Sequence, residues 1–208
     1  MRKSILLAFF MMAFFSVALA QQTWVETTIS KEAGKKLEFS IAPQIRFDEG
    51  FSTEEYFLDA GMEYKLSKYF KLGTQYRLGN KMNKNNEAEA FGRFAIDAKT
   101  GFKWNNFEPG FRLRFTNSDD FEDDEKKNYL RYKFGLEYHW KKLNLKPYVA
   151  FEIYQNLTEN DFDKRKYETG IMYKINKHHQ IGSYWRINEN LNKNKSVAVI
   201  GISYKLNL

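Results

Sequence analysis

The sequence lacks cysteine altogether, and histidine and proline occur only three times each. Without cysteine the chain has no disulfide framework, and it is not a lipoprotein, because lipid attachment requires a cysteine at the first residue of the mature chain. Long apolar runs are also scarce. Only one, near the N-terminus, approaches the length of a membrane helix, and 28% of the residues are charged. A helical membrane bundle is therefore excluded.

Aromatic residues, in contrast, are abundant. The chain has 19 Phe, 13 Tyr and 4 Trp, which make up 17% of its 208 residues. A chain so rich in aromatic side chains has enough apolar surface to fold, which excludes disorder. Its length permits one domain, or two at most.

Residues 1–20 have the pattern of a cleaved signal peptide. Residues 2–3 are basic, residues 5–19 form an almost unbroken apolar run, and residues 18–20 (Ala-Leu-Ala) give a small-x-small cleavage site before Gln21. The alternative, a membrane anchor, is disfavoured because the run falls short of the about 20 residues that cross a bilayer. Export of a chain without disulfides indicates a bacterial envelope. The net charge of +7 therefore does not indicate a nucleic-acid partner.

Period-two alternation of apolar and polar residues runs through nearly the whole mature chain, whereas helical spacing is hard to find. In residues 36–47, for example, Leu37 and Phe39 share one face, and Glu38 and Ser40 share the other. The pattern predicts an all-β fold with ten strands, at residues 36–47, 55–66, 70–78, 93–104, 107–115, 130–140, 143–153, 167–175, 181–187 and 198–208.

Soluble sandwiches and lipocalin-like barrels also have alternating strands. Two features favour a membrane barrel here: charged residues recur along whole strands on one face, and the apolar face is rich in aromatic residues near the strand ends. Two aromatic girdles are typical of outer-membrane barrels. They are predicted at Trp104, Phe107, Tyr138, Trp140 and Tyr173 beside short turns, and at Phe47, Tyr56, Tyr76, Phe115 and Tyr167 beside long loops.

The connections between the predicted strands alternate in length, as do the short periplasmic turns and longer outer loops of outer-membrane barrels. Long loops are predicted after Phe47, Leu78, Thr116, Gln155 and Ile187, and short turns after Leu66, Trp104, Trp140 and Ile175. Ten strands bring Leu208 to the periplasmic end, beside the N-terminus. Residues 201–208 resemble the terminal insertion signal of outer-membrane barrels, with Leu208 in place of the usual phenylalanine.

Residues 23–30, which include Trp24, also have the composition of a strand. Counting them gives eleven strands and places the mature N-terminus outside the cell, so we expect a short periplasmic or pairing segment instead. The predicted organisation is a signal peptide at 1–20, an N-terminal segment at 21–35 and an antiparallel transmembrane outer-membrane β-barrel at 36–208. A barrel of twelve strands is the alternative.

Several landmarks resemble the domain-of-unknown-function 2490 family of exported proteins from Bacteroidota. They are Trp24 near the mature end, a first long strand that closes on residues 46–47 (Arg-Phe), and the hairpin at Trp104 that returns through residues 112–115 (Arg-Leu-Arg-Phe). The resemblance covers nearly all of residues 21–208. It implies an outer-membrane barrel, and it implies no activity and no catalytic residues.

The charged face of the predicted strands would line the lumen of the barrel. Its candidate residues are Arg46, Arg77, Arg93, Asp97, Arg112, Arg114, Arg131, Glu137 and Arg186. Basic residues outnumber acidic ones on this face. An aqueous pore with anion preference has such a composition, and so does a closed lumen with paired charges, because ten strands leave little more room than the filled interior of an eight-stranded barrel.

No catalytic residue, metal ligand or cofactor is predicted. A hydrolase would need His139 and Ser203 within hydrogen-bond reach, and the sequence does not bring them together. The adjacent His178 and His179 would point to opposite sides of an extended segment, which does not suit a metal site. The acidic run at residues 119–125 is interpreted as a solvated loop.

The sequence thus predicts a small barrel in the outer membrane of a Gram-negative bacterium. Its role is expected to be structural or partner-binding, or that of a narrow channel for small polar or anionic solutes. Expected partners are outer-membrane lipid and lipopolysaccharide, together with the barrel-assembly machinery through the C-terminal strand. The alternatives are a lipid-modifying outer-membrane enzyme and a soluble periplasmic β-barrel binding protein.

Overall fold

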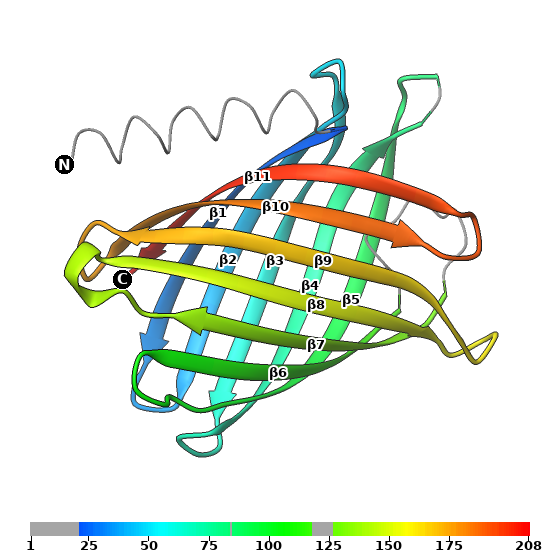
Figure 1. Cartoon of the computed structure of the whole chain (residues 1–208). Helices are drawn as coiled ribbons and strands as arrows, with labels where there is room; N and C mark the ends of the chain where they lie inside the picture. Colours follow the sequence, from blue (N-terminus) through cyan, green and yellow to red (C-terminus); the bar gives the residue numbers. More distant parts are fainter. Residues whose placement is uncertain (1–20, 84, 118–126) are drawn as a thin grey trace.

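The computed structural model describes residues 21–83, 85–117 and 127–208, which form a closed barrel of eleven strands (Figure 1). The strands are β1 (Gln22–Ala33), β2 (Leu37–Phe47), β3 (Thr53–Lys65), β4 (Phe70–Met82), β5 (Ala88–Gly101), β6 (Phe107–Thr116), β7 (Tyr129–Tyr138), β8 (Leu145–Asn156), β9 (Asp161–Lys174), β10 (His179–Asn190) and β11 (Lys195–Asn207). A short 3-10 helix, η1 (Lys141–Leu143), precedes β8. In the described part of the chain, no helix is long and apolar enough to cross a membrane.

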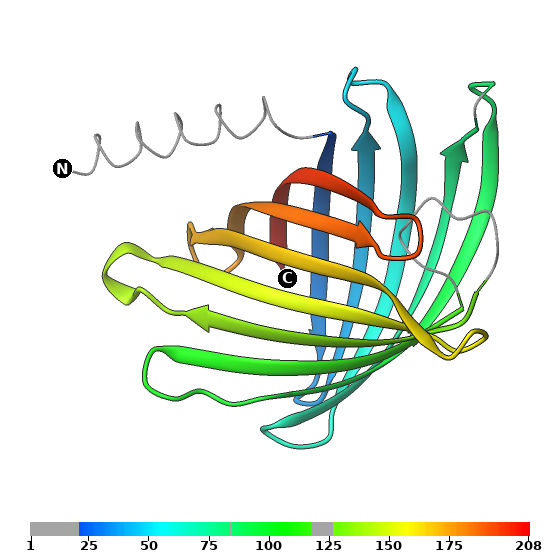
Figure 2. The same cartoon turned by 45° about the vertical axis from the view of Figure 1, so that its right-hand side comes forward.

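Neighbouring strands are antiparallel except β1 and β11, whose parallel pairing closes the barrel. Figures 1 and 2 show β1–β5 on one wall and β7–β11 on the opposite wall, crossing at a steep angle as tilted barrel strands do. The end of the barrel that holds the connections after β1, β3, β5, β7 and β9 is called the turn end below. The opposite end, which holds the connections after β2, β4, β6, β8 and β10, is called the loop end.

The predicted alternation decides which face of each strand points into the barrel. Ile41, Leu58 and Leu78 lie on the outer wall with 51%, 45% and 57% of their surface exposed, whereas Asp59 and Arg77, each next to one of these leucines in the chain, are buried in the lumen. A soluble sandwich would bury the apolar face instead. The apolar outer wall and polar interior match an outer-membrane barrel and confirm the predicted fold class.

Strand β1 corrects the prediction that residues 21–35 form a segment outside the barrel. It pairs antiparallel with β2 and parallel with β11, with Trp24 opposite Gly201. Without β1, two strand edges would stay unpaired, and Trp24, which packs against Tyr184 and Val199, would lose its buried site. Because β1 runs from the loop end toward the turn end, Gln22 does not lie beside Leu208, as ten strands would have required.

The strands also extend further toward the loop end than predicted. β8 ends at Asn156 and β9 begins at Asp161, while β10 ends at Asn190 and β11 begins at Lys195. The connection after β2, residues 48–52, is no longer than the one after β4, residues 83–87. The long loops predicted after Phe47, Leu78, Gln155 and Ile187 are therefore short hairpins, and that prediction was wrong, whereas the connection after β6, residues 117–128, is long as predicted. Alternation marks only the amphipathic part of a strand, whereas the backbone ladder continues through polar residues because its hydrogen bonds do not depend on side-chain type.

Two predicted features lie outside the described residues. They are the signal peptide at residues 1–20 and the acidic run at residues 119–125, which belongs to the connection between β6 and β7.

Aromatic side chains gather at the turn end, as predicted. The ring of Phe107 lies 6.3 Å from that of Trp104 and 5.0 Å from that of Tyr138, measured between centroids. Trp104 is 70% exposed, and Trp140, two residues beyond the end of β7, is exposed as well. A group of large aromatic rings on the outer wall, close to one rim, has the composition of an interfacial girdle.

Candidate functional site

Charged side chains from most strands surround a cavity of about 220 Å³ in the lumen, called the central chamber below. Nine basic and four acidic side chains of the described residues line it. The lining residues are Trp24, Glu26, Gln44, Arg46, Asp59, Gln75, Arg77, Arg93, Arg112, Arg114, Arg131, Lys133, Ala150, Glu152, Lys166, Glu168 and Arg186. A cavity of this volume has room for several water molecules or for a small polyatomic ion.

Cross-strand register produces two of the ion pairs in the lumen. Asp59 of β3 lies directly opposite Arg77 of β4, and Asp97 of β5 lies directly opposite Arg114 of β6. Arg77 donates from Nε and Nη2 to the two carboxylate oxygens of Asp59 at 2.7 Å each. Arg114 forms the same bidentate pair with Asp97, with hydrogen bonds of 2.5 and 2.7 Å. All four side chains are buried, so these pairs are held in a fixed geometry.

Two further carboxylates are each shared by two cations. Glu152 accepts two hydrogen bonds of 3.1 Å from Arg131 and one of 2.7 Å from Arg112. Glu168 accepts a hydrogen bond of 2.7 Å from Nε of Arg186 and lies 3.5 Å from Nζ of Lys133. Sharing of this kind compensates only part of the positive charge, so the chamber wall stays net basic.

Aromatic rings support some of the arginines of the chamber. The guanidinium carbon of Arg46 lies 3.7 Å from the centroid of the Trp24 ring, and that of Arg77 lies 3.4 Å from the centroid of the Phe57 ring. Arg186 lies 4.8 Å from Trp24 on the same measure. Stacking on aromatic rings stabilises a desolvated guanidinium without consuming its N–H donors.

Some buried N–H donors of the chamber lining have no hydrogen-bond partner among the described residues. Nε of Arg112 and Nε2 of Gln44 are two such atoms. A buried donor without an acceptor costs free energy. Both donors belong to residues that line the chamber, so an acceptor bound there is a natural partner for them.

The lumen is filled toward the loop end and open toward the turn end. At the loop end, Tyr129, Tyr154, Asn156, Lys164 and Thr116 are almost completely buried, and the hydroxyl of Tyr129 accepts a 2.9 Å hydrogen bond from Nζ of Lys164. At the turn end lies a wider cavity of about 560 Å³, called the vestibule below. The vestibule and the chamber share lining residues: Glu26, Arg112, Lys133, Ala150, Glu168 and Arg186.

The structure brings most of the predicted lumen residues together. Seven of them line the chamber: Arg46, Arg77, Arg93, Arg112, Arg114, Arg131 and Arg186. Asp97 reaches the same group through Arg114, whereas Glu137 lies apart from it and lines the vestibule. Sequence reasoning missed Trp24 and Glu26, although their alternation with Val25 and Thr27 could have identified them.

The histidine and serine considered for a hydrolase have different partners. Nε2 of His139 lies 2.7 Å from a carboxylate oxygen of Glu108, while the hydroxyl of Ser203 contacts the sulfur of Met172. Their geometry therefore gives no support to a serine nucleophile activated by His139.

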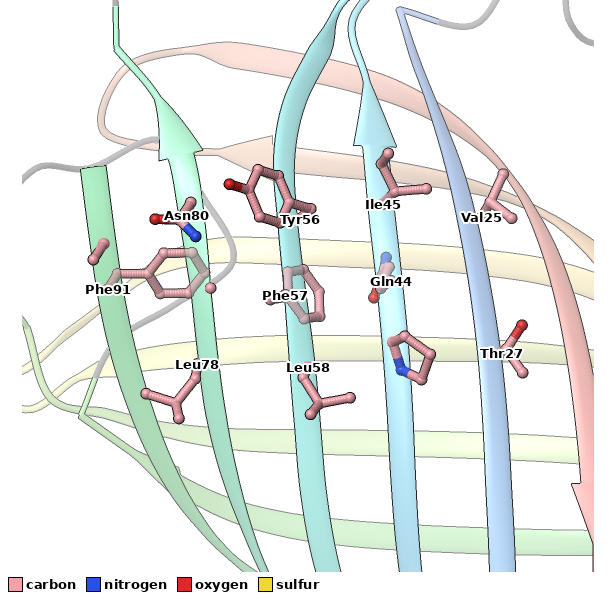
Figure 3. A pocket seen from close by; sticks show the side chains of 13 residues that line it. Val25, Thr27, Gln44, Ile45, Tyr56, Phe57, Leu58, Leu78, Asn80 and Phe91 are labelled. Atoms are coloured by element: carbon pink, nitrogen blue, oxygen red, sulfur yellow. The ribbon is translucent and has the colours of Figure 1, made fainter. Parts of the chain in front are cut away.

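The outer wall has a hollow of about 670 Å³ over β1–β5, shown in Figure 3. Val25, Ile45, Tyr56, Leu58 and Leu78 are among the side chains that line it, and none of its lining residues is charged. The hollow is larger than the central chamber but lacks its chemistry, so the chamber is the stronger candidate site.

Comparison with known proteins gives a fold and a family. None of the curated proteins is significantly similar to the chain. Among solved structures, LpxR from Salmonella typhimurium has a TM-score of 0.53 at 10% identity, with 87% of each chain covered. An anion-selective porin from Comamonas acidovorans has a TM-score of 0.38 at 10% identity, with 80% of this chain covered, and the chain spans 55% of the porin's length.

At such low identity the likeness to LpxR shows the barrel fold alone. The family whose description is "Protein of unknown function (DUF2490)" matches residues 21–198, which is most of the chain. The chain therefore belongs to the DUF2490 family.

Proposed function

We propose that the chain is an outer-membrane β-barrel that binds a small oxyanion, of the size and charge of inorganic phosphate, in a closed lumen. The apolar outer wall, the aromatic rings near one rim and the barrel fold shared with LpxR support the membrane setting. In this proposal the turn end faces the periplasm, because the longest connection between two strands, residues 117–128 between β6 and β7, belongs to the opposite end, and the longer loops of outer-membrane barrels face outward. The anion then enters through the vestibule.

The surplus of basic side chains around the chamber carries the proposal. Nine basic side chains of the described lining face four acidic ones. Glu55 and Asp97 bind Arg46 and Arg114 without lining the chamber, and counting them still leaves nine basic side chains against six acidic ones. A buried surplus of positive charge is costly, so an anion in the chamber would stabilise the barrel. The planar N–H groups of arginine suit the oxygens of phosphate.

A narrow channel for small anionic solutes is the second candidate. The shared wall of the vestibule and the chamber favours it, because a solute could move from one to the other. The buried side chains at the loop end argue against passage of a solute through the barrel, because they occupy the lumen between the chamber and that rim. Binding without free passage therefore fits the geometry better.

Replacement of Arg112 by glutamine tests the binding proposal. Arg112 has a buried Nε without a partner, and its other contact, Glu152, keeps Arg131 when Arg112 is lost. A hydrogen bond to a charged group contributes about 1.5–3 kcal/mol, so Arg112→Gln is expected to weaken phosphate binding by about tenfold or more. Isothermal titration of the refolded barrel with inorganic phosphate measures the dissociation constant.

The matched control is Arg165→Gln. Arg165 alternates with the buried Lys164 and Lys166 on β9 and lies opposite Ile153, so its side chain belongs to the outer wall. Its replacement should leave phosphate binding unchanged. A wild-type barrel that folds but binds no phosphate, or an Arg112→Gln variant that binds as tightly as the wild type, would contradict the proposal.

A further inference from the structure

Glu108, Glu137 and His139 form a cluster at the turn end, outside the central chamber. Glu108 of β6 lies directly opposite Glu137 of β7, and His139 follows two residues after Glu137 on the same face. The backbone N–H of His139 donates a 2.7 Å hydrogen bond to the carbonyl of Asn106, which keeps the two chain segments paired beyond the end of the strands. The three side chains therefore meet because of strand register, although Glu108 and Glu137 are far apart in the sequence.

The geometry of this cluster suits a metal ion. One ligand atom from each of the three side chains lies within 4.8 Å of the other two, and Nε2 of His139 lies 2.7 Å from Oε2 of Glu108. A tetrahedral zinc ion with bonds of about 2.0–2.2 Å holds its ligand atoms about 3.3 Å apart. The side chains of Glu108 and Glu137 are exposed, so side-chain rotations that move their ligand atoms by up to about 1.5 Å would accommodate an ion with that spacing.

The charges of the cluster also favour binding of a cation. Two carboxylates directly opposite each other on neighbouring strands repel. Among the described residues, the side chain of Glu137 forms no hydrogen bond or ion pair, and the side chain of Glu108 pairs only with the imidazole of His139. Lysines such as Lys71 and Lys99 line the same vestibule, but they bind Glu63 instead. The cluster thus keeps two carboxylates and a ring nitrogen together without a basic side chain of the described residues between them.

We propose that Glu108, Glu137 and His139 bind a divalent transition-metal ion, best represented by Zn²⁺. An imidazole nitrogen favours zinc over Ca²⁺ or Mg²⁺, which prefer oxygen ligands alone. Three protein ligands leave one position of a tetrahedral ion for water or another ligand. Because Glu108 and Glu137 line the vestibule, that position faces the route to the chamber. The ion also links β6 to β7 at the rim.

Zinc titration of the refolded, untagged chain in phosphate-free buffer tests the proposal, with competition against a fluorescent zinc chelator as the readout. The wild type is expected to bind one Zn²⁺, and His139→Ala and Glu137→Gln are each expected to weaken binding at least about tenfold. The matched control is His178→Ala, because His178 is an exposed histidine in a turn at the same end. This variant should bind zinc as the wild type does.

Cobalt provides a second readout that does not depend on stability. Co²⁺ bound by an imidazole and two carboxylates in a tetrahedral site gives visible absorption, and His139→Ala should abolish it while the variant still shows a barrel circular dichroism spectrum. Equal zinc affinity of the wild type and His139→Ala would overturn the proposal. So would a loss of binding in His178→Ala alone, because the ion would then bind at the histidine turn.

Discussion

Replacement of Glu152 by glutamine is expected to lower the free energy of unfolding by about 3–5 kcal/mol, the cost of breaking a buried ion pair by removing one partner. Glu152 is 4% exposed and binds both Arg131 and Arg112. Its neutralisation leaves two guanidinium groups in a chamber that is already net basic. Urea titration of the refolded barrel, followed by tryptophan fluorescence, measures the loss.

The control for this experiment is Glu49→Gln. Glu49 is exposed in the connection between β2 and β3, and substitutions at such surface positions change stability by about 0.5 kcal/mol or less. If Glu152→Gln lowered the free energy of unfolding no more than Glu49→Gln does, the charges of the chamber would have to be well solvated. The description of a closed basic lumen would then be wrong.

Replacement of Gly201 by alanine is the second change with a large expected effect. Gly201 lies on β11 at the closing seam, opposite Trp24 on one side and Tyr184 on the other. A Cβ atom at this position would lie 2.0–2.4 Å from atoms of the Tyr184 ring. Because that ring is buried against Trp24 and Val199, it cannot move aside freely. Overpacking of this kind costs about 1–3 kcal/mol.

Gly135→Ala is the matched control for the seam. Gly135 also lies in a strand, but a Cβ atom added there would have the carbonyl oxygen of Val149 as its nearest neighbour, 3.9 Å away, which is ordinary contact. Heat-modifiability on gels and urea titration compare the two variants. Gly201→Ala should unfold at lower urea than the wild type, and Gly135→Ala should not. Equal behaviour of both variants would show that the β1–β11 seam is loosely packed.

The sequence was sufficient to predict the fold class because one property, period-two alternation, governs every strand. It assigned Arg77 and Arg114 to the charged face and Phe39 to the apolar face, and in the structure the two arginines are buried in the lumen while Phe39 is exposed on the outer wall. Strand β1 was missed despite the alternation around Trp24, because the expectation of an even strand number outweighed the local pattern. Because β1 pairs in parallel with β11 and antiparallel with β2, no strand edge stays unpaired, and the barrel closes with an odd number of strands.

The details of the site depend on register, which alternation does not determine. The pattern places Arg112 and Arg131 in the lumen, but only the register of β6, β7 and β8 brings both arginines to the carboxylate of Glu152. In the same way, Glu108 and His139 meet only because β6 and β7 pair at Glu137. Sequence reasoning therefore identified the lumen side chains but not their partners.

Planar-bilayer conductance of the refolded chain, after a heat-shift gel has shown that it is folded, tests the central claim that the lumen is closed. The ion pairs around the chamber and the buried side chains at the loop end block the lumen. We therefore expect the barrel to insert into the bilayer without conducting ions, with no stable current steps in concentrated KCl. Stable, uniform steps with a reversal potential under a salt gradient would contradict the account, because ions could cross such a lumen only if its ion-paired layer were open.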